Sequence, residues 1–200
     1  MVAQSRLYRT AVRLEDAAAQ DGPVGVLAAA ARRTVTGPRR RSVLGGRWLG
    51  HALHPLLTDV PLGTWMSASF LDLAGGRAAR PAAQRLVAAG LVASLPTVAA
   101  GLSDWTVTTR GQQRVGVVHA AANTAALGLY AASLVARRRG RHPAGVGLGL
   151  LGATAASVGG FFGGHLALAT DASERASRDA VGLAPTPPSG ATPSSSPSAP

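Results

Sequence analysis

Four apolar stretches, separated by loops that carry arginine, constrain this chain more than any other feature. They cover about residues 55–73, 85–102, 115–136 and 144–169. A bilayer is crossed by about 20 mainly apolar residues, and each stretch has roughly that length. The interiors of the last three carry no charge, whereas a helix of a soluble bundle carries charge along its exposed face. The sequence therefore predicts an all-α integral membrane protein, an up-down-up-down four-helix bundle.

The side-chain composition favours close helix packing in lipid. The chain is 46% hydrophobic but only 4% aromatic, and it contains 25 glycines. Small residues let helices approach closely in a bilayer, and the last stretch repeats glycine at four-residue spacing. There is no cysteine, which excludes disulfides, thiolate zinc sites and cysteine-held iron–sulfur clusters on this chain.

All 20 basic residues are arginines, and the formal net charge is +11. The arginines stand in short clusters between the apolar stretches, as expected beside anionic headgroups, and no polar domain offers a nucleic-acid surface. We therefore expect a lipid bilayer as partner and no nucleic acid. Eight flanking arginines against seven do not decide the orientation. The long, charged N-terminal stretch without an export signal favours a multi-pass plasma-membrane protein with both termini in the cytoplasm.

Three regions are expected along the chain. Residues 1–45 predict two short amphipathic helices at the membrane surface, about Arg6–Ala19 and Pro23–Arg33. Residues 46–170 form the transmembrane domain. Residues 171–200 form a tail rich in proline and serine, which we expect to be disordered from about residue 181.

Polar residues gather at one side of the predicted bundle. In up-down-up-down topology the starts of the first and third helices and the ends of the second and fourth share a membrane side. Four of the five histidines fall there. The set comprises His51, His54, Asp59, Asp104, His119, Asn123 and His165.

Helix depth selects a preferred pair within this set. His119 and His165 each lie about one turn inside their helix ends, so they can meet near one level. Ionisable groups within a membrane usually face the bundle interior and tend to be functional. Histidines on facing helices hold b-type haem, and imidazole also binds transition metals. We expect His119 and His165 as axial ligands with His51 and His54 as alternates, or a metal site with the ligands His51, His54, Asp59, His119 and His165, supported by Asp104 and Asn123.

A purely structural interpretation stays open beside this one. Polar residues at helix ends bond headgroups, water and loops. Asp59 can either cap a turn around Pro61 or pair with an arginine such as Arg114. At the opposite end we expect Asp72 to be an interfacial cap near Arg77, and His142 to be a solvated surface residue.

The ordered string of motifs resembles one family. "GRWLGHALHPLLTDVPLGTWMSASFLDL", "AGLSDW", "RVGVVHAAAN" and "GGHLA" are similar to the bacterial membrane family called Domain of Unknown Function 2231, over about Gly46 to Leu168. The resemblance implies four membrane helices and no established activity. Some members carry a C-terminal Rieske-type ferredoxin domain, which implies membrane electron transfer with a redox or Rieske-type partner, although a Pro/Ser tail replaces that domain here. The matching positions are His51, His54, Pro55, Asp59, Pro61, Asp104, Trp105, His119, Asn123, Gly164 and His165.

Three functions remain open at this point. The first is a cofactor or redox membrane protein, and the second is a non-catalytic anchor or assembly subunit. The third is a small transporter, which is disfavoured because little polarity continues across the second to fourth helices. The sequence contains no phosphate loop, H-E-x-x-H motif or nucleophile elbow, so it does not support an enzyme with its own turnover.

Overall fold

The computed structural model describes residues 6–35 and 37–180, and every regular element within them is helical. Four long helices correspond to the four apolar stretches. They are α4 (Leu53–Ala74), α5 (Arg80–Trp105), α6 (Arg110–Arg138) and α7 (His142–Ala180). Each begins before its predicted stretch and ends after it, because polar residues continue the helix beyond the apolar segment. The tail predicted to be disordered from about residue 181 lies outside the described residues.

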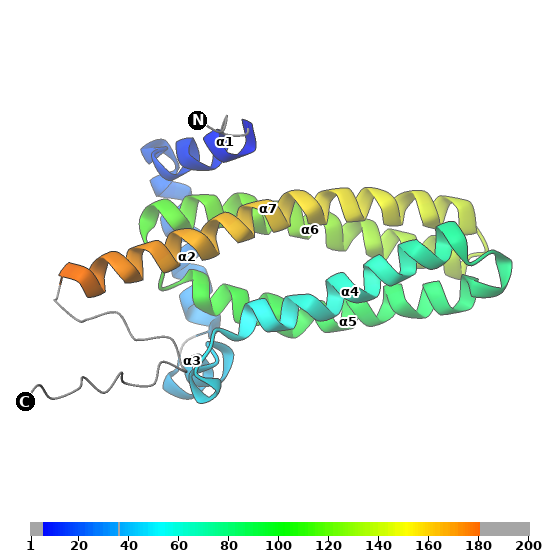
Figure 1. Ribbon diagram of the computed structural model, residues 1–200, viewed down its shortest axis with the longest axis horizontal. Helices are drawn as coiled ribbons and strands as arrows, with labels where there is room; N and C mark the ends of the chain where they lie inside the picture. Colours follow the sequence, from blue (N-terminus) through cyan, green and yellow to red (C-terminus); the bar gives the residue numbers. More distant parts are fainter. Residues whose placement is uncertain (1–5, 36, 181–200) are drawn as a thin grey trace, which may run out of the picture.

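The long helices form two antiparallel hairpins that lie side by side (Figure 1). α4 and α5 make one hairpin, α6 and α7 make the other, and packing within each hairpin is more extensive than packing between them. α4 and α6 both start at the end where the N-terminal helices gather, so these two helices run parallel.

Three helical segments are long and apolar enough to cross a membrane: residues 77–105, 110–138 and 142–168. α4 does not reach the same hydropathy, although it has 22 residues. Its two aspartates, its histidine and its threonines and serines dilute the leucines and valines. The chain is therefore an all-helical membrane-type protein with three clear candidate spans.

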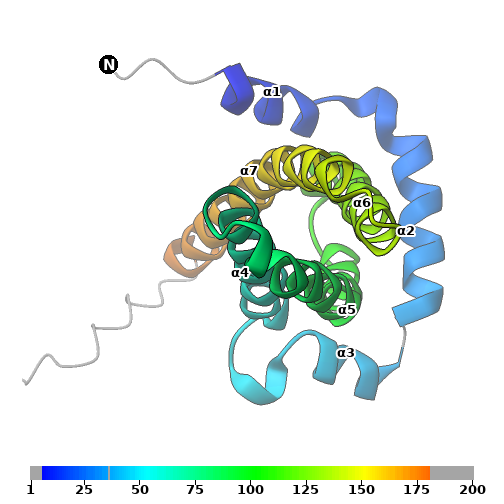
Figure 2. The ribbon, with the colours of Figure 1, turned by 90° about the vertical axis from the view of Figure 1, so that its right-hand side faces the viewer.

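Shorter helices surround one end of the bundle. They are α1 (Arg6–Glu15), η1 (Ala18–Gln20), α2 (Asp21–Val35), α3 (Pro38–Leu44) and η2 (Arg47–Leu49). α1, α2 and α3 follow the circumference of the bundle when it is viewed end-on (Figure 2). We call residues 6–49 the collar. The helix expected over Arg6–Ala19 stops at Glu15, and α3 was not expected from the sequence.

Partly buried polar contacts fix the collar to the bundle. The Arg114 guanidinium donates to both carboxylate oxygens of Asp21, at 2.8 and 2.9 Å, and also to the Glu15 carbonyl. The expectation that Arg114 pairs with Asp59 is therefore wrong. Ala11 of α1 packs in one apolar cluster with Val115 and Phe162. The collar is thus a docked part of the fold.

The two hairpins repeat one pattern of side chains. Three pairs face each other between α4 and α6, and the partners in each pair are 65 positions apart. Trp65 and Tyr130 stack with ring centres 4.0 Å apart, and each packs against a glycine of its own hairpin. Those glycines, Gly90 and Gly152, are 62 positions apart. The other facing pairs are His54 with His119 and Asp72 with Arg137.

The Asp72–Arg137 pair closes the end of the bundle that lies away from the collar. Arg137 donates to Asp72 at 2.8 and 2.5 Å, and the two side chains are only 1% and 4% exposed. His142 Nε2 lies 3.6 Å from the same carboxylate. The expectations of an Asp72 cap near Arg77 and a solvated His142 are therefore wrong. The register places Asp72 opposite a buried guanidinium, which requires an anionic partner.

Candidate functional site

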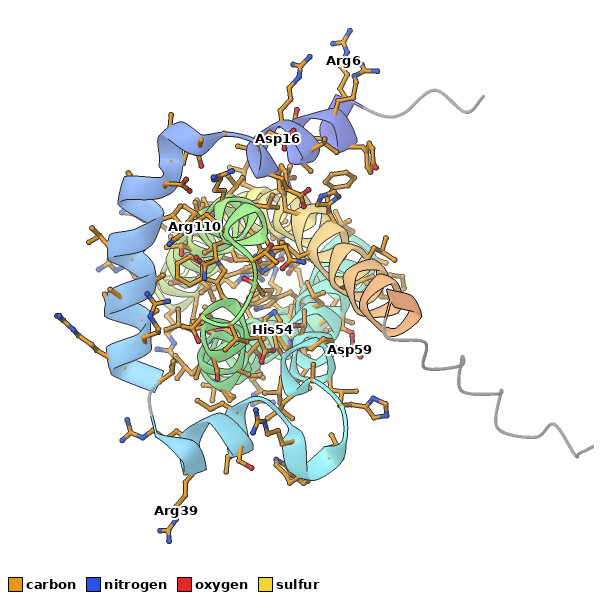
Figure 3. All side chains as sticks on the ribbon, turned by 90° about the vertical axis from the view of Figure 1, so that its left-hand side faces the viewer. Arg6, Asp16, Arg39, His54, Asp59 and Arg110 are labelled. Atoms are coloured by element: carbon orange, nitrogen blue, oxygen red, sulfur yellow. The ribbon has the colours of Figure 1, made fainter. Side chains whose placement is uncertain are left out.

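His54 and His119 meet between the two hairpins. Their ring centres are 6.2 Å apart, and the ring planes are nearly perpendicular, at 83°. His54 lies among the helices in the view along the bundle (Figure 3). The structure thus joins two of the four predicted histidines, one from the first hairpin and one from the second.

Each of these rings is held in the same way by its own hairpin. His54 Nδ1 lies 2.9 Å from the Thr97 carbonyl of α5, and His119 Nδ1 lies 2.8 Å from the Gly159 carbonyl of α7. A carbonyl oxygen only accepts, so in the neutral rings Nδ1 carries the proton. This tautomer leaves the lone pair on Nε2, as in a histidine prepared to bind a metal.

A glycine lies beneath each ring. A Cβ on Gly101 would lie 2.7 Å from His54 Nδ1, and a Cβ on Gly163 would lie 2.9 Å from His119 Cε1. Both glycines come four residues after the carbonyl that holds the ring, which is one helical turn. Each hairpin therefore holds its histidine ring in the same way, with a backbone carbonyl beside Nδ1 and a glycine against the ring one helical turn further along.

Further polar residues complete the surroundings. One turn after each histidine, a side chain donates to that histidine's own carbonyl: Thr58 Oγ1 at 2.8 Å in α4 and Asn123 Nδ2 at 2.9 Å in α6. Asn123 Nδ2 also lies 3.3 Å from each ring nitrogen of His119. Asp104, half-buried at the end of α5, interacts electrostatically with His54.

His165 has other partners. Its Nε2 lies 3.1 Å from Glu15 Oε1, and its ring contacts the Tyr8 ring edge-on at 5.7 Å. Gly163 faces His119, and a residue two positions further along a helix points about 200° away from it. The expected pairing of His119 with His165 is therefore replaced by the pairing with His54.

The remaining predicted residues lie apart from this pair. His51 is exposed in the turn before α4, and Asp59 is exposed on the outer side of α4 (Figure 3). Among the side chains that the structure describes, no three of the histidine, aspartate or glutamate type come together as metal ligands. The residues expected as one five-ligand metal site therefore do not form a single group.

Sequence reasoning missed the residues that hold the two histidine rings in place. These are Thr97 and Gly159, whose carbonyls accept from Nδ1, and Gly101 and Gly163, which lie against the rings. The internal repeat was the signal that could have found them. A histidine is followed eleven positions later by an aromatic residue in both α4 and α6, and a Leu-Gly dipeptide stands two residues before each aromatic residue. The second hairpin is three residues shorter at its turn, and once this difference is allowed for, Thr97 and Gly101 of α5 correspond to Gly159 and Gly163 of α7, each pair 62 positions apart.

Comparison with known proteins identifies one family. The family described as "Predicted membrane protein (DUF2231)" matches residues 50–173. This range includes the four long helices almost entirely and both histidines of the pair, but not the collar. No curated protein and no solved structure matches the chain.

Proposed function

We propose that this chain, which belongs to the DUF2231 family of predicted membrane proteins, is a membrane haem protein with His54 and His119 as the axial ligands of a b-type haem. The observation that carries the proposal is the facing of two imidazoles from equivalent positions of two repeats. One group bound between the hairpins would then be held equally by both.

The separation of the rings suits two ligands of one iron. An imidazole nitrogen binds a first-row metal at about 2 Å, and the ring centre lies about 1 Å behind that nitrogen. An iron held by both imidazoles would therefore separate their ring centres by about 6 Å, and the observed separation is 6.2 Å.

The number of ligands favours haem over a bare metal ion. Structural zinc sites use four protein ligands and catalytic ones use three, and the described residues bring no three such side chains together. A porphyrin supplies four nitrogens itself, so haem needs only two axial ligands from the protein. Two histidines on facing helices of a bundle meet this requirement.

The residues around the pair have defined roles under this proposal. The carbonyls of Thr97 and Gly159 hold the ring orientation and raise the basicity of Nε2 by accepting from Nδ1. The Asp104 carboxylate favours positive charge beside His54. Haem supplies one-electron chemistry when bound, so we propose membrane electron transfer with a redox partner, for which a Rieske-type protein is the candidate class.

The proposal includes a membrane arrangement. We propose that α4 also spans the bilayer, since it matches α6 in register over 19 residues from His54 to Asp72. Two of its polar side chains, His54 and Asp72, find partners on α6. Four spans bring both chain ends to one side, which we propose to be the cytoplasmic side of the plasma membrane.

Absorbance of the full chain purified in detergent tests the proposal. We expect a Soret band and about one haem per chain, as counted by extraction of the haem. His54→Ala and His119→Ala should each lose the band or change it. His51→Ala is the matched control, because His51 lies three residues from His54 and is exposed. A wild-type chain without haem after expression with ample haem would contradict the proposal and favour an anchor or assembly subunit.

A further inference from the structure

We infer that the outer face of the collar binds acidic phospholipids. The first 50 residues contain nine arginines but only three acidic residues. Opposite charges of such a segment often neutralise one another on its surface. Here the structure separates them instead, and the separation leaves a basic outer face.

Two of the three acidic residues of the collar pair with side chains of the bundle. Glu15 pairs with His165 of α7, and Asp21 pairs with Arg114 of α6. These contacts attach the collar to the bundle. Asp16 is the acidic residue of the described collar that remains exposed without such a contact to the bundle.

Several arginines of the collar have exposed side chains. Arg6 and Arg39 point away from the bundle on opposite sides of the end-on view, roughly perpendicular to the bundle axis (Figure 3). Arg13, Arg40 and Arg47 are also exposed. Because the collar follows the circumference of the bundle, these side chains reach the space where lipids surround the protein (Figure 2). The planar guanidinium fork matches phosphate oxygens.

Exposed apolar residues accompany these arginines. Val26 is 71% exposed, Trp48 is 66% exposed and Val43 is 57% exposed. Tryptophan prefers the headgroup level of a bilayer, and an interfacial helix combines apolar residues with basic ones. An acidic soluble protein would suit the charge but would not require the exposed apolar side chains of Val26, Val43 and Trp48. A leaflet of acidic lipid satisfies both features.

The test compares two lipids on the purified full chain. Native mass spectrometry with equimolar phosphatidylglycerol and phosphatidylcholine should show a preference for phosphatidylglycerol of at least about tenfold, since each arginine near an anionic surface contributes about 1 kcal/mol. The quadruple variant R6Q/R13Q/R39Q/R47Q should reduce this preference to within about twofold. R77Q/R85Q/R138Q/R139Q removes the same charge at the other end and should keep the preference.

A second measurement needs no charge variant and covers the case in which the collar variant does not fold. Trp48 fluorescence, isolated by subtraction of a Trp48→Phe chain, should be quenched more by brominated phosphatidylglycerol than by brominated phosphatidylcholine. The difference should shrink at high salt, because screening weakens exposed charges. Equal binding of the two lipids by the wild-type chain, or an equal loss in the far-end variant, would overturn the inference.

Discussion

The two ends of the α4–α6 interface use the same register for opposite purposes. At one end Asp72 and Arg137 face each other and neutralise each other in a nearly closed environment. At the other end His54 and His119 face each other, and each donates a hydrogen bond from Nδ1 to a backbone carbonyl. Neither imidazole can then donate to the other through Nε2. The charges neutralise each other at one end, whereas at the other end each imidazole keeps a lone pair on Nε2, and Asn123 Nδ2 lies 3.3 Å from that of His119.

The same repeat therefore forms a structural contact at Asp72 and Arg137 and a candidate binding site at His54 and His119. Equivalent positions carry opposite charges at Asp72 and Arg137, which hold the hairpins together at one end. They carry the same base at His54 and His119 at the other end. The stacked Trp65 and Tyr130 lie between these two pairs and are similar in both hairpins.

The largest expected effect comes from breaking the charge pair on one side only. Asp72→Asn leaves the Arg137 guanidinium buried without its anion, and Arg137→Gln leaves the carboxylate. Either change should lower the free energy of unfolding by about 3–5 kcal/mol. Unfolding of the purified chain in mixed detergent measures this.

The matched control removes both charges. The double variant D72L/R137L should recover most of the loss, because well-packed apolar residues replace a buried ion pair at little cost. If the single variants are as stable as the wild type, the pair does not hold the hairpins. If the double variant is as unstable as the single ones, packing rather than charge explains the loss.

A smaller effect is expected beneath His119. Gly163→Ala places a methyl group against a ring that the Gly159 carbonyl already holds, so the ring must shift. Haem affinity should fall about tenfold, which corresponds to about 1.4 kcal/mol. Gly164→Ala is the neighbouring control, since nothing lies within 4 Å of its Cβ position. Equal haem affinities in titrations of the two variants would show that the ring position does not matter.

The smallest effect is expected at the histidine that joins the collar to α7. His165→Gln removes the contact between His165 Nε2 and the Glu15 carboxylate, which is partly exposed, with Glu15 30% accessible, so it should cost less than about 1 kcal/mol. The absorbance spectrum should not change. A lost Soret band in this variant would restore His165 as a ligand.

Much of the fold could be predicted from the sequence. The apolar stretches marked all four long helices, and the errors at their ends arose because residues such as Arg80 and Arg110 extend a helix past its apolar part. The collar was only partly predicted, since α1 and α2 were expected but their docking depends on Asp21 meeting Arg114, a contact between distant segments.

The histidine pair shows why the site was harder to predict. Depth along a helix follows from counting residues, and it correctly placed His119 near the collar end. Rotation about the helix axis does not follow from depth, and it decides that Gly163 faces His119 while His165 faces Glu15. The 65-residue repeat supplies that missing rotation, because it relates His119 to His54 directly.

The ligation state of the iron tests the central claim most directly. Resonance Raman or electron paramagnetic resonance of the ferric wild-type chain should show a low-spin haem with two imidazole ligands. His54→Ala and His119→Ala should each yield high-spin haem or none, and His51→Ala and His165→Gln should keep the low-spin signal. A haem that remains low-spin with two imidazoles after either alanine substitution would contradict a site shared between the two hairpins.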